Sequence, residues 1–204
     1  MLDNTWIGSL PVDRDDELIR KHLEGDPQAT RTLIETYQDM VYSLASRMLN
    51  DEDDARDAAQ ETFLQVLRAL PKFRGECALR TWIYRIACNA CIAGSKRQSR
   101  RRATEISRTS EQSTDVDVED PTPPSLESIE QSEQQDTVRQ AIGTLPEKYR
   151  IVVVLHYMES RSLAEITDIL MISMSTVKIR LYRARQLLKK SWSGCRYDVF
   201  QHKR

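Results

Sequence analysis

A pair of short helices rich in cations is the feature that most restricts how this chain can fold. Residues 162–190 read SLAEITDILMISMSTVKIRLYRARQLLKK, with apolar side chains at three- and four-residue steps. In the second half of the segment this spacing places one set of side chains on a single helical face: Met174, Val177, Leu181, Ala184 and Leu188. An amphipathic helix, a turn and a second, cationic helix together predict a helix-turn-helix that lies against the major groove of DNA.

The charge of the chain is segregated along the sequence. The 204 residues carry 30 Lys and Arg against 31 Asp and Glu, which gives a formal net charge of −1. Binding to nucleic acid must therefore come from local basic clusters and not from overall attraction. One cluster lies at residues 96–102 and another in the cationic helix, whereas residues 103–135 are rich in acids and hold a single base, Arg108.

Composition also excludes several classes of protein. No window approaches the roughly 20 apolar residues of a membrane span, and the first residues lack the pattern of an export signal. The four cysteines have no disulfide-framework spacing, so we expect an intracellular protein of the reducing cytoplasm. Cys88 and Cys91 form a C-x-x-C pair without a second pair of ligands, which favours small buried helix residues over a metal site or thiol switch.

Helical periodicity runs through most of the chain, and no part of the first half alternates with the period of strands. We expect an N-terminal extension at 1–14 and a helical bundle over 15–102. Residues 103–133 lack periodicity and are rich in Ser, Thr, Asp and Glu, which predicts a flexible acidic linker. A second helical domain should span 134–192, with a tail at 193–204. The predicted fold is therefore all-α, with two small helical domains joined by the linker.

Both helical blocks resemble the extracytoplasmic-function (ECF) sigma factors of bacterial RNA polymerase, which belong to the sigma-70 family. The segments DEDDARDAAQETFLQVLRALPKFRG and LRTWIYRIACNACI resemble region 2 of that family. The segments TLPEKYRIVVVLHYMESRSLAEITDIL and STVKIRLYRARQLL resemble its region 4. The resemblance implies an alternative sigma factor that joins the polymerase core, directs it to promoters and assists promoter opening. It implies no catalytic chemistry and no cofactor.

Region 4 of such a factor reads the upstream (−35) promoter element as duplex DNA. An arginine on the groove face can pair with guanine, while hydroxyl groups and lysines more often hold phosphates. The resemblance assigns this role to seven residues at the start of the cationic helix and along it: Ser175, Thr176, Lys178, Ile179, Tyr182, Arg183 and Arg185.

Region 2 of the family reads the downstream (−10) element as a single strand. Unstacked bases need aromatic and guanidinium surfaces, and the backbone needs a basic groove. The matching residues are Lys72, Phe73, Arg74, Arg80, Tyr84, Arg85, Asn89, Lys96 and Arg97. For Phe73 and Tyr84 a structural role in the bundle remains an alternative to contact with DNA. Trp82 is expected to be a core residue rather than a wedge that melts DNA, because Leu79 and Ile86 share its helical face.

The resemblance also implies partners. The helix over 53–70 is similar to the surface that docks on the polymerase, with candidate residues Asp57, Gln60, Glu61, Leu64 and Gln65. The expected partners are the core enzyme, through its β′ clamp helices and β flap, promoter DNA, and an anti-sigma factor able to hold the chain at the inner membrane face. No small-molecule substrate is expected.

Turn and cap residues give further expectations. Asp26 and Pro27 are typical of a helix start. Met171 stands in the turn of the helix-turn-helix, where the family often has Gly, a residue that accepts a left-handed backbone without strain. Ser173 can cap the cationic helix.

Two other functions remain as alternatives. The chain could be a stand-alone helix-turn-helix regulator whose N-terminal bundle senses a ligand or dimerises, acting without the core polymerase. A weaker hypothesis is an enzyme such as a nuclease. The sequence argues against this hypothesis, because carboxylates and histidines do not converge on a recognisable catalytic spacing.

Overall fold

The computed structural model describes residues 12–49, 51–108 and 138–191, and every regular element in them is a helix, which confirms the all-α class. The first unit contains α1 (Val12–Leu23), α2 (Pro27–Met48), α3 (Glu52–Ala69), the short 3-10 helix η1 (Leu70–Lys72) and α4 (Leu79–Arg108). The second unit begins with a helical segment at 138–143 and continues with α6 (Glu147–Val153), the π-helical turn η2 (Val154–Met158), α7 (Leu163–Leu170) and α8 (Met174–Ser191).

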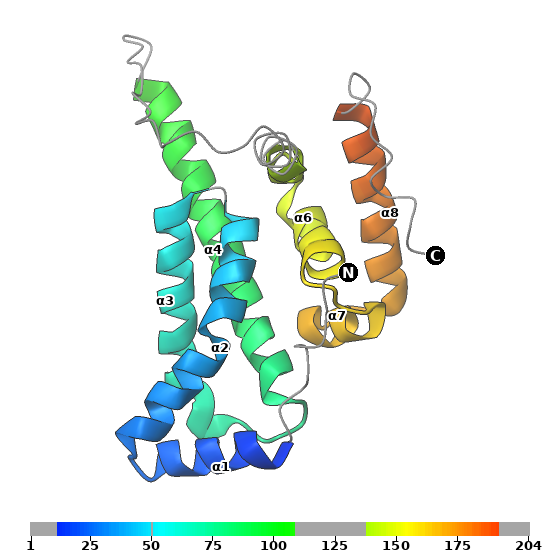
Figure 1. Cartoon of the computed structure of the whole chain (residues 1–204). Helices are drawn as coiled ribbons and strands as arrows, with labels where there is room; N and C mark the ends of the chain where they lie inside the picture. Colours follow the sequence, from blue (N-terminus) through cyan, green and yellow to red (C-terminus); the bar gives the residue numbers. More distant parts are fainter. Residues whose placement is uncertain (1–11, 50, 109–137, 192–204) are drawn as a thin grey trace, which may run out of the picture.

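The first unit is a bundle in which α2, α3 and α4 pack side by side and α1 crosses the end of α2 (Figure 1). The buried side chains of α2 recur at three- and four-residue steps, which gives this helix one apolar face. Each of the three long helices contributes almost fully buried side chains to the core: Leu33, Val41, Leu44, Ala58, Val66, Ile83 and Ala87. These contacts hold the exposed faces of α3 and α4 in fixed positions.

The helix starts follow the cap residues in the sequence. The Asp26 carboxylate accepts a hydrogen bond from the Gln28 backbone N–H at 2.8 Å, and Pro27 is the first residue of α2, as predicted. Asp51 caps α3 in the same way, accepting from the Asp54 N–H at 2.8 Å. Each such cap is worth about 1 kcal/mol of stability.

A buried polar contact fixes α1 on α2. The Tyr37 phenol donates to the Asp15 carboxylate, 3.0 Å from both oxygens, and both residues are buried. Burial raises the pKa of Tyr37 far above its usual value of 10, and the neighbouring Asp15 carboxylate raises it further. The phenol is therefore neutral and a donor at neutral pH.

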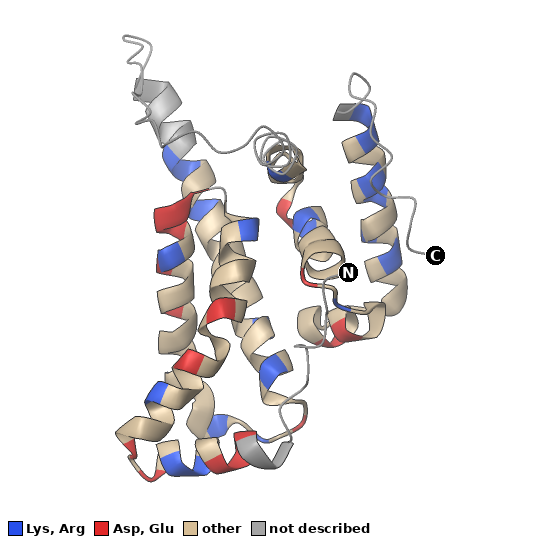
Figure 2. Ribbon diagram, in the orientation of Figure 1, with Lys and Arg blue, Asp and Glu red and all other residues tan. Residues whose placement is uncertain are grey.

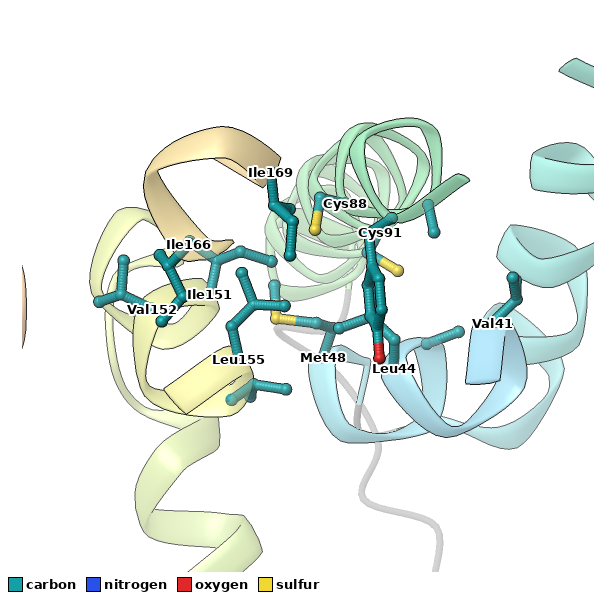
Figure 3. Close-up of a cluster of buried hydrophobic side chains, with 14 of the residues drawn as sticks. Val41, Leu44, Met48, Cys88, Cys91, Ile151, Val152, Leu155, Ile166 and Ile169 are labelled. Carbon is teal, nitrogen blue, oxygen red and sulfur yellow. The ribbon is translucent and has the colours of Figure 1, made fainter. Parts of the chain in front are cut away.

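The two units share one continuous hydrophobic core (Figure 3). Met48 of α2 lies beside Leu155 of η2, and Cys88 of α4 lies beside Ile169 of α7. The prediction of two helical units is confirmed, but in this structure they pack directly on one another.

Two boundaries differ from the sequence-based expectation. Helix α4 continues to Arg108, whereas the linker was expected to begin at residue 103, and α1 begins at Val12 instead of 15. Residues 103–108 contain neither Pro nor Gly. A helix that is already formed gains one backbone hydrogen bond for each added residue, so it continues through such a segment at little cost. The rest of the predicted linker, 109–133, lies outside the described residues.

Candidate nucleic-acid and polymerase interfaces

The helix-turn-helix is formed by α7 and α8, as the sequence predicts. A capping box starts α7: Ser162 Oγ accepts from the Glu165 N–H at 3.2 Å, and Glu165 Oε2 accepts from the Ser162 N–H at 2.8 Å. Helix α7 ends at Met171, which has φ 53° and ψ 43° and is therefore left-handed. A side chain in that conformation costs about 1 kcal/mol relative to glycine. The sequence has Met at this position despite the strain, and the Met171 side chain is 72% exposed.

A small cluster of hydroxyl groups lies at the start of α8. Ser173 Oγ accepts a hydrogen bond from the Thr176 N–H at 3.2 Å, which confirms Ser173 as the cap of this helix. The same oxygen lies 2.9 Å from Ser175 Oγ and 2.8 Å from Thr176 Oγ1. The positive end of the helix dipole and this hydroxyl cluster form a surface suited to a phosphate oxygen.

Helix α8 turns one face to the core and one to solvent. Val177, Leu181, Ala184 and Leu188 are buried. Figure 2 shows Lys and Arg residues along the helix. The predicted −35 residues lie on the remaining surface, all exposed except the half-buried Thr176: Ser175, Thr176, Lys178, Ile179, Tyr182, Arg183 and Arg185. Ile179 is 52% and Tyr182 62% exposed, so apolar and aromatic groups lie among the cations.

Two of these arginines are positioned by tyrosines of neighbouring helices. Arg183 lies beside Tyr149 of α6 and lowers the pKa of its phenol. Arg185 Nε donates to the Tyr157 phenol oxygen at 2.9 Å, with the guanidinium 5.9 Å from the ring centroid. The supporting roles of Tyr149 and Tyr157 were not predicted, because only the fold brings α6 and η2 beside α8.

The predicted −10 residues fall into two groups. The first is exposed and consists of Lys72, Arg74, Asn89, Lys96 and Arg97. Phe73 is half-buried in the loop after η1, and its ring lies 5.1 Å from that of Trp82, between centroids. Trp82 is itself half-buried against the core, so this aromatic pair fixes the loop while one edge stays accessible.

The second group consists of Arg80, Tyr84 and Arg85, and the last two contact the second unit. Tyr84 is only 1% exposed, and its phenol donates to Glu159 Oε2 at 3.0 Å. Arg85 Nε donates to the Asp168 carbonyl of α7 at 2.8 Å. Arg80 has a buried Nε with no hydrogen-bond acceptor among the described residues. In this arrangement Tyr84 is covered and Arg85 is engaged, so neither presents a free side chain to DNA.

The polymerase-docking candidates form one stripe on α3. Asp57, Gln60, Glu61, Leu64 and Gln65 recur at three- and four-residue steps, opposite the buried Ala55, Ala58, Thr62 and Val66. Leu64 is 40% exposed. Gln65 Nε2 donates to Glu61 Oε1 at 2.7 Å. The stripe thus combines an exposed apolar side chain with carboxylates and amides.

The cysteine pair is buried in the bundle. Burial raises the pKa of the Cys91 thiol to about 12 and that of Cys88 well above its usual value. Among the residues that the structure describes, no group of three or more His, Cys, Asp or Glu side chains could hold a metal ion. None of the described helices is both long and apolar enough to cross a lipid bilayer.

An exposed cationic helix-turn-helix, packed on a helical bundle whose α4 carries exposed basic residues, is the arrangement of a DNA-binding transcription factor. Residues 33–101 match the family model for sigma-70 region 2, and residues 135–188 match that for sigma-70 region 4. The chain is 32% identical over 186 residues to the RNA polymerase sigma-H factor of Pseudomonas aeruginosa, covering 89% of this chain and 95% of that protein. It is 34% identical over 174 residues to the ECF RNA polymerase sigma factor SigW of Bacillus subtilis, covering 84% and 93%.

Solved structures agree on the fold. CnrH, in complex with the cytosolic domain of CnrY, aligns with a TM-score of 0.60 and 21% identity over 91% of this chain and all of that one. The sigma factor RpoE of Bartonella quintana, in complex with the anti-sigma factor NepR, aligns with a TM-score of 0.56 and 20% identity over 81% of this chain and 98% of that one. The chain therefore belongs to the ECF sigma factors of the sigma-70 family and is an alternative sigma factor, a factor of transcription initiation.

Proposed function

We propose that this sigma factor binds the core RNA polymerase, directs it to specific promoters and assists their opening. The observation that carries the proposal is the presence of both promoter-reading modules, in order, on one chain. Region 2 matches residues 33–101 and region 4 matches residues 135–188. In this proposal residues 15–102 work as region 2 and 134–192 as region 4, with 103–133 joining them and 1–14 and 193–204 as flanking segments.

The −35 element is read by α8 in this proposal. Arg183 pairs with a guanine edge, Lys178 holds a phosphate, and Ile179 contacts a thymine methyl group. The hydroxyls of Ser175 and Thr176 bind phosphate at the helix start, and Tyr182 lies against the sugar-phosphate backbone. The exposure of these side chains supports the assignment. Arg185 contributes charge from its position on Tyr157.

The −10 element is read by the loop after η1 and by α4. Lys72, Phe73 and Arg74 form the pocket for an unstacked base, and Asn89 pairs with a base edge. Lys96 and Arg97 follow the backbone phosphates. The exposure of five of the nine predicted residues supports this assignment. Arg80 lies one turn before Tyr84 on the same helix, and Tyr84 and Arg85 join this surface only when the second unit is displaced.

The α3 stripe docks on the β′ clamp helices of the core, and the second unit docks on the β flap. The chemistry of the stripe supports this docking role, because Leu64 supplies apolar area and Asp57 and Glu61 can pair with basic side chains of a partner. The chain acts by binding, without enzymatic chemistry, cofactor or small-molecule substrate.

An inhibitory partner also belongs to the proposal. Two solved structures with this fold are complexes, one with the cytosolic domain of CnrY and one with the anti-sigma factor NepR. We expect this chain to act in the cytoplasm and to have an anti-sigma factor that can hold it at the inner membrane face.

Run-off transcription with purified core polymerase tests the function. The sigma factor should give promoter-specific transcripts only with the core enzyme, and bind promoter DNA weakly or not at all alone. The alternative, a stand-alone helix-turn-helix regulator, predicts footprints on palindromic duplex without polymerase. Footprints of that kind, without transcripts, would establish the alternative.

A further inference from the structure

The turn η2 of region 4 is wider than the helix that leads into it. The Glu159 N–H donates to the Val154 carbonyl, five residues earlier, at 2.9 Å, which is the π-helical pattern. In a regular α-helix each residue turns about 100°, so the eight residues from Tyr149 to Tyr157 would rotate the second ring about 80° from the first. A π turn has more residues per turn and reduces this rotation. Both rings accordingly lie toward α8, and each lies beside an arginine of that helix.

Tyr157 contacts Arg185 in two ways. Arg185 Nε donates to the phenol oxygen at 2.9 Å, and the guanidinium lies 5.9 Å from the ring centre. The Tyr157 ring is half-buried against the core, and the ring of His156 meets it edge-on, at 4.7 Å between centroids. His156 Nδ1 in turn donates to the Arg161 carbonyl at 3.0 Å. The phenol oxygen is therefore an acceptor that its neighbours hold in a fixed place.

The contact leaves the outer edge of the Arg185 guanidinium available to a ligand. The residue is exposed, and within the described parts of the chain Nε makes the one hydrogen bond of this side chain. The two terminal nitrogens form a planar fork whose N–H groups can pair with two oxygens of a phosphate. By binding Nε, Tyr157 sets the direction of this fork without occupying it.

The place of Arg185 on α8 indicates a phosphate ligand and not a base. Lys178 lies seven residues before it, which is about two helical turns, so the two cations share one edge of the helix. This edge lies between the buried side, which includes Leu181, and the outward face, where Ile179 is almost opposite the buried side. Side chains of the outward face meet base edges in a groove, whereas those at an edge meet the backbone that borders it.

We propose that Tyr157 is a positioning residue for promoter binding. It holds Arg185, before DNA binds, in the orientation that pairs with one phosphate of the −35 element. This inference deepens the proposed function and rests on it, because the phosphate belongs to promoter DNA. A long side chain that is ordered only on binding loses rotamer freedom at that moment, which weakens affinity. Arg185 avoids this loss because the phenol has already ordered it.

Tyr157→Phe removes the phenol oxygen and keeps the ring. Holoenzyme that contains this variant should bind its promoter about three- to ten-fold more weakly, the range expected when one long side chain must be ordered on binding. The charge of Arg185 remains, so the salt slope and the base preference should both stay at the wild-type values. Arg185→Ala should instead reduce the salt slope by about one.

Tyr42→Phe is the matched control. It removes the same atom from a tyrosine that is 38% exposed on α2, outside region 4, and should keep the wild-type affinity. An affinity loss in this control as large as that in Tyr157→Phe would overturn the assignment to Tyr157.

A double-mutant cycle separates positioning from general support of the fold. In an Arg185→Ala chain, adding Tyr157→Phe should change promoter affinity by less than about two-fold, because no guanidinium is left to order. Single methylphosphonates along the −35 element, each of which neutralises one phosphate, should reveal one position at which both single variants lose their effect. A full loss from Tyr157→Phe in the Arg185→Ala chain would overturn the positioning role.

The orientation of Arg185 can be measured without DNA or polymerase. In the full-length chain, the heteronuclear 1H–15N NOE of the Arg185 Nε–H, assigned from its absence in Arg185→Ala, should match that of the α8 backbone and fall in Tyr157→Phe. A low value already in the wild type overturns the ordering, and an ordered Arg185 whose release leaves affinity unchanged overturns the role in binding. If no form binds a promoter with core polymerase, the proposed function fails and the NOE result stands.

Discussion

The Tyr84 phenol of α4 donates to Glu159 Oε2 at 3.0 Å, across the boundary between regions 2 and 4. Burial raises the pKa of Tyr84 far above 10, and the Glu159 carboxylate raises it further. The pKa of Tyr37 is raised for the same two reasons, burial and a neighbouring carboxylate, which there is Asp15. The fold thus depends on two neutral phenols, each of which donates to a carboxylate.

Alkaline pH should therefore destabilise the protein. Because the folded pKa of Tyr84 exceeds the unfolded value of about 10, its contribution is complete below pH 10 and is lost as pH rises toward the folded value, at up to about 1.4 kcal/mol per pH unit. Urea denaturation between pH 8 and pH 11 measures this loss. Tyr84→Phe should be less stable at pH 8 but lose less stability above pH 10. Equal losses above pH 10 in the variant and the wild type would contradict the role of Tyr84.

The left-handed residue at the end of α7 predicts a stabilising substitution. Met171 has φ 53° and its side chain is 72% exposed, so Met171→Gly removes backbone strain at little cost in packing. We expect a gain of about 1 kcal/mol in the free energy of unfolding, measured by urea denaturation. Met171→Ala is the control, since it shortens the side chain and keeps the strain. A gain of the same size in the alanine variant would show that the side chain, not the backbone, is responsible.

Local signals in the sequence predict most of each unit. Asp26 as a cap, Pro27 as a first residue, Ser173 at the start of α8 and the helix-turn-helix all follow from residue spacing and short-range chemistry. The strained turn at Met171 follows from the resemblance to a family that often has Gly there. These features depend on neighbours within a few residues, which a sequence displays directly.

The contacts between the units could not be predicted in the same way. Ser43, Arg47 and Tyr84 meet Glu159 over separations of 75 to 116 residues. Nothing beside Glu159 distinguishes it from an exposed carboxylate, and Tyr84 does not fit the apolar stripe of its own helix. For this reason the sequence left the role of Tyr84 open, and its burial follows only from the packing of α7 and η2 on α4.

Two cations of α8 should have separable effects on DNA binding. Arg183→Ala should weaken binding to the −35 element by about 1–3 kcal/mol and relax base preference there, because a guanine contact is lost. Lys178→Ala should weaken binding uniformly across sequences and reduce the salt slope by about one. Holoenzyme binding to a set of single-base promoter variants at several salt concentrations measures both effects. An unchanged base preference in Arg183→Ala would place that side chain on a phosphate instead.

The α3 stripe predicts a loss of polymerase binding without a loss of fold. Leu64 is 40% exposed and is the apolar residue of the stripe, so Leu64→Arg places a charge where the proposal requires apolar contact with the clamp. We expect core affinity to fall at least about ten-fold, because burying an unpaired charge at an interface costs more than 1.4 kcal/mol. Leu23→Arg is the matched control: Leu23 is 51% exposed on α1, outside the stripe.

Both variants should keep the wild-type free energy of unfolding in urea, because both side chains are exposed. Core binding, measured by competition with a labelled wild-type chain, should then separate them. Equal affinity of the two variants would mean that α3 does not dock through this face. A loss in Leu23→Arg alone would move the docking surface to α1 and leave Asp57 and Glu61 as solvent-exposed charges.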